Sequence, residues 1–475
     1  MGRRAAPSVS HRNTLPKASH RPSRHDLLAV NAPMALAGAQ ARASSSRQLD
    51  IPSLDGIRAM SFAIVFAGHA GLGDIVPGGF GVTVFFFLSG FLITTLLRIE
   101  FQEHGEISLR RFYLRRALRI LPPFYVALAL AVALTLLAIL PGALSRDATL
   151  AQIFYWANYW TIEHTTAGQA LGTGVYWSLA VEEHFYLLFP LVFLLLLRSR
   201  LGARRQAIVL WSICALVLVW RSVLAYPLGL AGDRTYMASD TRIDSILFGC
   251  ALAVYGNPVL DGAGAIPSRI WKYALLPAAL ALLLFSFAYR DPQFRETLRY
   301  SLQGVALYPI FVVAVRWSAW GPFRLLNLPF VRFLGVLSYS LYLVHQVILY
   351  GVSANVPVPP ILAGAIALAL SLLIAFAIHR LVERPAARLR RRLERQSVSQ
   401  PSPDTAPRLG RRSAGDEARR GTPDHGLTLV ELPRGGGLAS HEAVPLVAPQ
   451  ERAEAGLRVA RRPPDEARGV AQPHR

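Results

Sequence analysis

A histidine and an arginine are spaced along the first long apolar segment in a way that suggests chemistry. Ten residues separate Arg58 from His69, so in a helix they lie about 16 Å apart along the axis. Histidine can accept a hydroxyl proton near neutral pH, and acyl transfer from a thioester to an alcohol needs such a base. His69 is therefore a candidate general base, the alternative being a helix-end histidine that contacts lipid headgroups. This reaction requires neither a metal ion nor a bound cofactor, and we expect neither.

Two further segments place polar groups beside apolar ones. Gly78–Ile93 combines small residues, which permit close helix packing, with the polar residue Ser89. Glu182 and Glu183 stand at the start of a strongly apolar segment, where a helix dipole favours carboxylates. They either stabilise this helix start, or one of them orients the histidine or the acceptor.

Other ionisable residues within apolar segments carry open alternatives, because a charge inside a bilayer costs about 2.5–3.5 kcal/mol. Arg242 and Asp244 form either an internal charge pair or a substrate contact. His345 either faces the same cavity as the candidate base or is a hydrogen-bonded structural residue. Arg116 and Arg119 are three residues apart on one helical face and suit the phosphates of an acyl-CoA. Retention of topology and contact with anionic lipid explain these two arginines equally well.

The elements that must position these residues are membrane-spanning helices. The chain has 475 residues, of which 53% are hydrophobic, and several apolar stretches approach the 20 or so residues that cross a bilayer. We predict an all-α bundle of about ten transmembrane helices. Their expected centres are Ala63, Phe87, Leu130, Leu188, Val217, Phe248, Leu282, Leu307, Leu343 and Leu370.

Charge and composition define the predicted organisation. Residues 1–50 form a flexible arm, residues 51–392 the membrane domain, and residues 393–475 a disordered Arg/Pro-rich tail. The formal net charge of +21 is concentrated in the tails and in alternate connections between the apolar segments. That pattern predicts a multi-pass protein of the inner (cytoplasmic) membrane with both termini in the cytoplasm, in contact with membrane lipid. It does not indicate nucleic-acid binding.

Several motifs, taken in order, resemble the bacterial acyltransferase 3 family between about Leu54 and Arg390. This family contains membrane O-acyltransferases that acetylate lipopolysaccharide O-antigen, exopolysaccharides, nodulation factors and macrolides. The matching residues are Leu54–Arg58 with His69, Phe85–Ile93, Arg116 with Arg119, Trp177–Glu182, Ser338–His345 and Glu383–Pro385. The sequence departs from the commonest family pattern at Thr83, where Asp is frequent, and at His184, where Gln is frequent.

The resemblance implies an O-acetyltransferase that uses acetyl-CoA, or another acyl-CoA, as co-substrate and a saccharide or lipid-linked glycan as acceptor. By this resemblance His69 is the candidate base, and Arg58, Arg116 and Arg119 are candidate contacts to the donor. Among the residues singled out in these segments and motifs, Glu182 is a second catalytic candidate, and Ser89, Trp177, Arg242, Asp244 and His345 are further candidate donor or substrate contacts. The competing hypothesis is a transporter or flippase that moves acyl groups or lipid-linked sugars without chemistry, although the Gly/Pro-broken helices in matching halves typical of such proteins are poorly developed.

Overall fold

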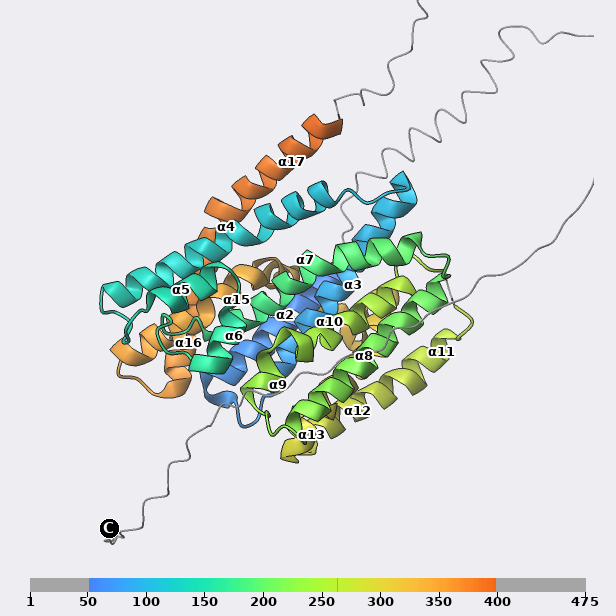
Figure 1. Ribbon diagram of the computed structural model, residues 1–475. Coiled ribbons are helices and arrows are strands. Elements are labelled where there is room, and N and C mark those ends of the chain that lie inside the picture. Colours follow the sequence, from blue (N-terminus) through green and yellow to red (C-terminus); the bar gives the residue numbers. More distant parts are fainter. Residues whose placement is uncertain (1–50, 263, 399–475) are drawn as a thin grey trace, which may run out of the picture. The chain divides into compact units, whose positions relative to one another are not determined.

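The described part of the protein is helical throughout. The structure, a computed structural model, describes residues 51–262 and 264–398 and contains no strand in these ranges (Figure 1). The predicted N-terminal arm, and the predicted tail beyond residue 398, lie outside them. The α-helices are α2 (Pro52–Ala67), α3 (Gly78–His104), α4 (Leu109–Leu136), α5 (Arg146–Ile153), α6 (Ala157–His164), α7 (Trp177–Arg198), α8 (Ala203–Ala225), α9 (Asp233–Met237), α10 (Ser239–Val254), α11 (Ser268–Ile270), α12 (Leu276–Ala288), α13 (Pro292–Glu296), α14 (Leu298–Arg316), α15 (Pro329–Asn355), α16 (Pro360–Ile378) and α17 (Arg384–Val398). Short 3-10 or π turns are η1 (Gly68–Leu72), η2 (Gly174–Tyr176), η3 (Trp271–Leu275), η4 (Gly321–Asn327) and η5 (His379–Glu383).

The predicted fold class, a polytopic helical membrane bundle, is confirmed. Each of the ten expected span centres falls within a helix. Within the described ranges, eight helical segments are long and apolar enough to cross a membrane. The two expected spans that fall short are α2 and α10, with 16 residues each, or about 24 Å of helix.

The short helices α2 and α10 lie at the centre of the bundle. α10 packs between α3 and α8, while α2 packs between α3 and α15 (Figure 1). The α3–α10 contact depends on glycine: a Cβ added to Gly90 would collide with the backbone of Ile246, and one added to Gly249 would collide with the backbone of Phe87. Small residues therefore let these two helices approach closely, as is common inside membrane bundles.

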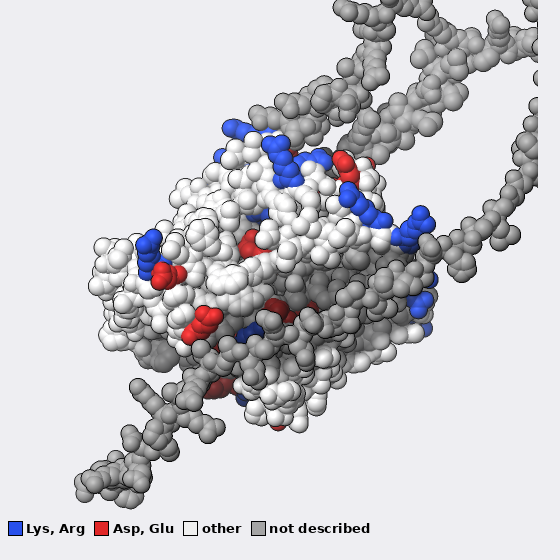
Figure 2. Space-filling view, in the orientation of Figure 1, with Lys and Arg blue, Asp and Glu red and all other residues white. Residues whose placement is uncertain are grey.

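Charged side chains are distributed unevenly over the described surface. Figure 2 shows Lys and Arg side chains gathered along the edge that holds α17, the start of α4 and the end of α7, whereas the middle of this face is nearly free of charge. We call this edge the basic end. The opposite ends of the long helices meet the short helices α5, α6, α9 and α13. A broad uncharged belt between two polar ends is the surface that a bilayer requires.

Candidate active site

The local backbone places His69 at the end of α2 that lies away from the basic end. The helix passes into the π turn η1, in which Gly71 has a positive φ of 91°. Gly68 lies directly against the start of α3, because an added Cβ would come within 2.8 Å of the Gly78 Cα atom. This close contact turns the chain so that the His69 side chain is exposed towards a cavity.

His69 is paired with the second histidine that the sequence analysis singled out. The His69 Nδ1 atom lies 3.0 Å from the His345 Nε2 atom, and the two rings stack with centroids 5.2 Å apart. His345 is fully buried, and its Nδ1 atom lies 2.8 Å from the carbonyl oxygen of Tyr342. The structure therefore brings His345 to the candidate base, although the two are 276 positions apart in the chain.

These contacts determine which ring nitrogens carry protons. A carbonyl oxygen only accepts hydrogen bonds, so the His345 Nδ1 atom must donate to Tyr342, and in the neutral ring the His345 Nε2 atom is then an acceptor. His69 consequently donates from Nδ1 to His345. The Nε2 atom of neutral His69 is left with a free lone pair, which is the state that a general base requires.

The cavity beside His69 has a volume of about 470 Å³ and a mixed polar and aromatic lining. The walls come from η1, the start of α3, α9, the α12–α14 connection and the start of α14. Burial raises the pKa of the Tyr236 phenol in this wall to about 12, so its hydroxyl stays protonated and can donate to a ligand. A space of this size with a few convergent polar groups is typical of a small-molecule site.

A second group of predicted residues gathers nearer the basic end. The Ser89 hydroxyl donates to the Glu182 carboxylate at 2.6 Å, and the Tyr186 hydroxyl donates to Ser89 at 3.1 Å. The Arg116 guanidinium lies over the Tyr186 ring, 3.8 Å from its centroid. The prediction that Glu182 or Glu183 orients the histidine is wrong for His69, because its ring is held by His345. A role for either carboxylate towards a substrate stays a prediction.

The remaining arginines predicted as donor contacts belong to the same region. The Ser108 hydroxyl caps α4 by accepting from the Arg111 backbone, which starts the helix that carries Arg116 and Arg119. Arg58 of α2 forms an ion pair with Asp55 at 2.5 Å. The charges of Arg58, Arg116 and Arg390 act on Arg119, so four guanidinium groups from α2, α4 and α17 converge there. Such a cluster suits an anionic ligand.

Arg242 and Asp244 do not form the internal charge pair that was one of the two alternatives. Asp244 is fully buried and pairs with Arg221 of α8 at 2.9 Å, with a further hydrogen bond from Ser301. Arg242 instead donates to the Thr83 hydroxyl at 3.1 Å. It lies among aromatic rings, one of which belongs to Trp177 at 5.9 Å.

Sequence reasoning missed three residues that matter to this arrangement. Arg221 had a visible signal, because an arginine within the apolar stretch of α8 needs a partner. Tyr236 and Tyr300 line the cavity and contact Arg242, but a tyrosine near a span end carries no comparable signal.

At position 184, the His184 ring makes a hydrogen bond of 2.6 Å with the Ser239 hydroxyl, away from the His69 pair.

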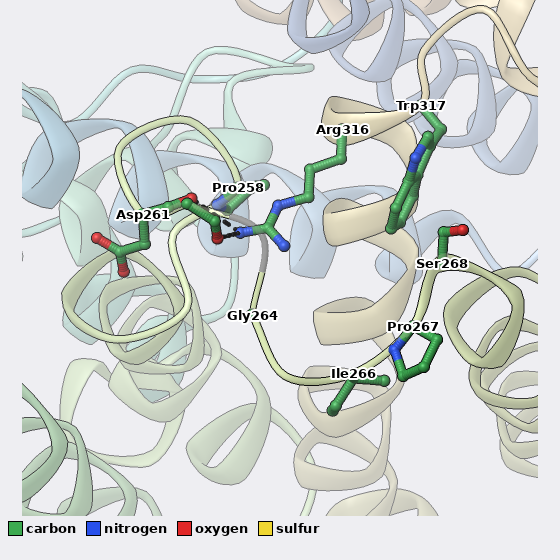
Figure 3. Close-up of a pocket in the computed structure, with 9 residues that line it drawn as sticks. Pro258, Asp261, Gly264, Ile266, Pro267, Ser268, Arg316 and Trp317 are labelled. Atoms are coloured by element: carbon green, nitrogen blue, oxygen red, sulfur yellow. Dashed lines mark hydrogen bonds between the residues drawn. The ribbon is translucent and has the colours of Figure 1, made fainter. Parts of the chain in front are cut away.

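A second hollow lies at the far end of α14 from the His69 cavity. It has a volume of about 520 Å³ and is lined by the α10–α11 connection together with Arg316 and Trp317. Figure 3 shows the Arg316 guanidinium donating to the backbone oxygens of this connection, those of Asp261 and Gly262, at 2.9 and 2.8 Å. The arginine is therefore engaged in holding the connection, and the lining contains no histidine.

The fold and the site together define a multi-pass membrane protein with a paired histidine beside a polar cavity within its helical bundle. The family profile described as an acyltransferase domain matches residues 51–380, and the chain belongs to that family.

Curated relatives agree with this assignment. The chain is 29% identical to the peptidoglycan O-acetyltransferase OatA of Listeria monocytogenes over 350 residues, covering 70% of this chain and 55% of the relative. It is 30% identical to the O-acetyltransferase OatA of Staphylococcus aureus over 357 residues, covering 70% and 57%. The match thus spans little more than half the length of these relatives. No solved structure matches the chain.

Proposed function

We propose that this protein is an integral membrane O-acyltransferase that transfers an acetyl group from acetyl-CoA to a hydroxyl of a saccharide. The observation that carries the proposal is the His69 ring, exposed in a polar cavity with its Nε2 lone pair free and its Nδ1 atom bound to buried His345. The names of the O-acetyltransferase relatives support the acetyl group, and the word peptidoglycan in one of them supports a saccharide acceptor.

In this proposal the acceptor hydroxyl loses its proton to the His69 Nε2 atom as its oxygen bonds to the carbonyl carbon of the thioester. The carbonyl π electrons move to oxygen and then return, the C–S bond breaks, and the leaving thiolate takes the proton from His69. The products are an ester and a free thiol. His345 supports the transient imidazolium by accepting from its Nδ1–H group.

The two groups of site residues suggest that donor and acceptor enter from opposite ends of the bundle. We assign the arginines at the basic end to the phosphates of the CoA donor and the cytoplasm, because positive charge favours that side of a membrane. The cavity beside His69 faces the other end and is assigned to the acceptor. Both termini then lie in the cytoplasm, and the chain resides in the cytoplasmic membrane.

The test uses the purified full-length protein in proteoliposomes with labelled acetyl-CoA and peptidoglycan-type oligosaccharides. The wild-type protein is expected to form alkali-labile ester, and His69→Ala is expected to lower this rate by 10²-fold or more, the usual contribution of a general base. His104→Ala is the matched control, because His104 is exposed and hydrogen-bonds to the Glu100 carbonyl of its own helix. Transport of label without ester formation, or full activity of the His69 variant, would refute the proposal.

A further inference from the structure

The Arg242 side chain is fully buried and forms no ion pair with a carboxylate of the described residues. Only its Nη2 atom has a hydrogen-bond partner, the neutral Thr83 hydroxyl. Its Nε and Nη1 atoms are buried without any partner. Removing a guanidinium from water is costly unless an opposite charge compensates it, and sites of ligand binding are where such a cost is retained.

Rings rather than carboxylates surround this guanidinium. Its Cζ atom lies 4.0 Å from the ring centroid of Tyr300 and 5.3 Å from that of Tyr236, with Phe86 and Trp177 slightly further away. Aromatic faces attract a cation but carry no net charge. They therefore hold Arg242 in place without neutralising it.

The nearest carboxylate already belongs to another arginine. Both oxygens of Asp244 accept from Arg221, and each accepts one further hydrogen bond, from Ser301 and from the Ser245 backbone. Arg221 also lies 5.2 Å from the Tyr300 ring. Two guanidinium groups thus share one carboxylate, which leaves an excess of one positive charge behind Tyr300.

This excess charge lies directly behind the wall of the His69 cavity. Tyr236 and Tyr300 contact Arg242 and also line the cavity. The charged residues of the lining cancel formally, because three arginines are balanced by three acidic residues. The field in the cavity is therefore biased towards anions by Arg242, because Asp244, the carboxylate that acts on it, is already paired with Arg221.

We propose that the His69 cavity selects an acceptor that carries a carboxylate, and that Arg242 is the residue that determines this specificity. The inference rests on the proposed function, since it assumes that the cavity holds the saccharide acceptor. The carboxylate lies against the tyrosine wall and is attracted through it by the guanidinium. Acidic saccharides, such as uronic acids, are the class of ligand that fits.

The expected size of the effect follows from the geometry. The Tyr300 centroid lies 4.0 Å from the Arg242 Cζ atom, and a carboxylate that meets the electropositive edge or the hydroxyl of this ring lies about 4 Å further from the guanidinium. Opposite unit charges about 8 Å apart, at an effective dielectric of about 20, change a binding constant by roughly tenfold to thirtyfold. A carboxylate should therefore be distinguishable from a neutral group on the same sugar.

The experiment measures binding, so it does not depend on acyl transfer. Full-length protein in nanodiscs is titrated calorimetrically with methyl glucuronide and methyl glucoside, which differ only in the carboxylate. The expected result is that the glucuronide binds at least tenfold more tightly. Equal affinities, or no binding of the glucuronide, would overturn the inference even if His69 proved essential for ester formation.

Substitutions at position 83 test whether the charge of Arg242 causes the preference for the glucuronide. Thr83→Asp places an internal carboxylate beside the Arg242 Nη2 atom and should reduce the preference for the glucuronide to about one. Thr83→Asn has nearly the same shape without the charge and should keep the preference. If the two variants show the same ratio of affinities, the charge of Arg242 is not what selects the ligand.

Discussion

At the residue scale, the hydrogen bond that His345 accepts from His69 leaves the other ring nitrogen of His69 free at the end of an apolar helix. A solvent-exposed imidazole exchanges between two tautomers, whereas here the carbonyl of Tyr342 fixes His345 and His345 in turn fixes His69. Because the partner is the neutral ring of His345, no carboxylate stands beside His69, the proposed base. The pair therefore resembles the base and orienting group of hydrolytic triads in its logic but uses a second imidazole.

Substitution of His345 tests this positioning role. His345→Phe preserves a planar ring but removes the acceptor, so His69 loses its preferred tautomer and kcat is expected to fall by about 10²-fold. His345→Gln offers an amide oxygen that can accept from the His69 Nδ1–H group and should recover about tenfold of that loss. The measurement is steady-state acetyl transfer at several acetyl-CoA concentrations.

A purely structural role for His345 predicts a different outcome. Both variants would then lose folded protein together, and the kcat of the remaining folded fraction would match that of the wild type. Detergent-solubilised size-exclusion profiles provide this control. A normal kcat in the Phe variant would show that the imidazole of His345 is not needed to orient His69.

The sequence identified many of the residues at the site but few of their partners. His69, His345, Ser89 and Glu182 were each visible as polar groups in apolar segments. The pairing of these residues was not visible, because a contact such as that between Ser89 and Glu182 joins residues of different helices that are 93 positions apart in the chain. Helical periodicity predicts which residues share a face of one helix but does not specify which helices are neighbours.

At the element scale, glycines in α3 and α10 determine how closely the central helices pack. Gly249→Val introduces side-chain atoms where the Phe87 backbone oxygen lies, so α10 must move away from α3. Overpacking of this kind usually costs about 1–3 kcal/mol, and a contact with rigid backbone belongs at the upper end. We expect a lower apparent melting temperature in detergent and weaker ester formation.

A glycine outside the bundle provides the matched control. Gly202 has an ordinary extended conformation and no atom within 4 Å of an added Cβ. Gly202→Val should therefore leave the melting temperature unchanged. Equal stability of the Gly249 and Gly202 variants would contradict the packing argument.

The elements themselves were more predictable than their lengths. Every expected span centre lies in a helix, because runs of apolar residues carry a strong signal. The limits of α2 and α10 were not evident: each has only 16 residues and is enclosed by longer helices. Burial within the bundle, rather than contact with lipid, explains how such short helices are accommodated at its centre.

At the scale of the whole molecule, the proposed reaction places the two ends of the bundle in different compartments. The arginine cluster near the basic end suits a cytoplasmic CoA ester, while the His69 cavity lies towards the other end of α2. The sequence predicted this polarity from the arginines in alternate connections. It could not predict the cavity, whose lining comes from three separate stretches of the chain, within residues 68–80, 232–236 and 286–303.

Cysteine labelling determines the orientation directly. Ile75, at the rim of the His69 cavity, is 81% exposed, whereas Gly202 is exposed in the α7–α8 connection at the basic end. Ile75→Cys should react with a membrane-impermeant maleimide in intact cells, and Gly202→Cys should react only after permeabilisation. The wild-type protein supplies the blank, because Cys214 and Cys250 are both buried. The reverse labelling pattern would place the arginine cluster outside the cytoplasm, where acetyl-CoA is not made, and would exclude acetyl-CoA as a donor that enters at the basic end.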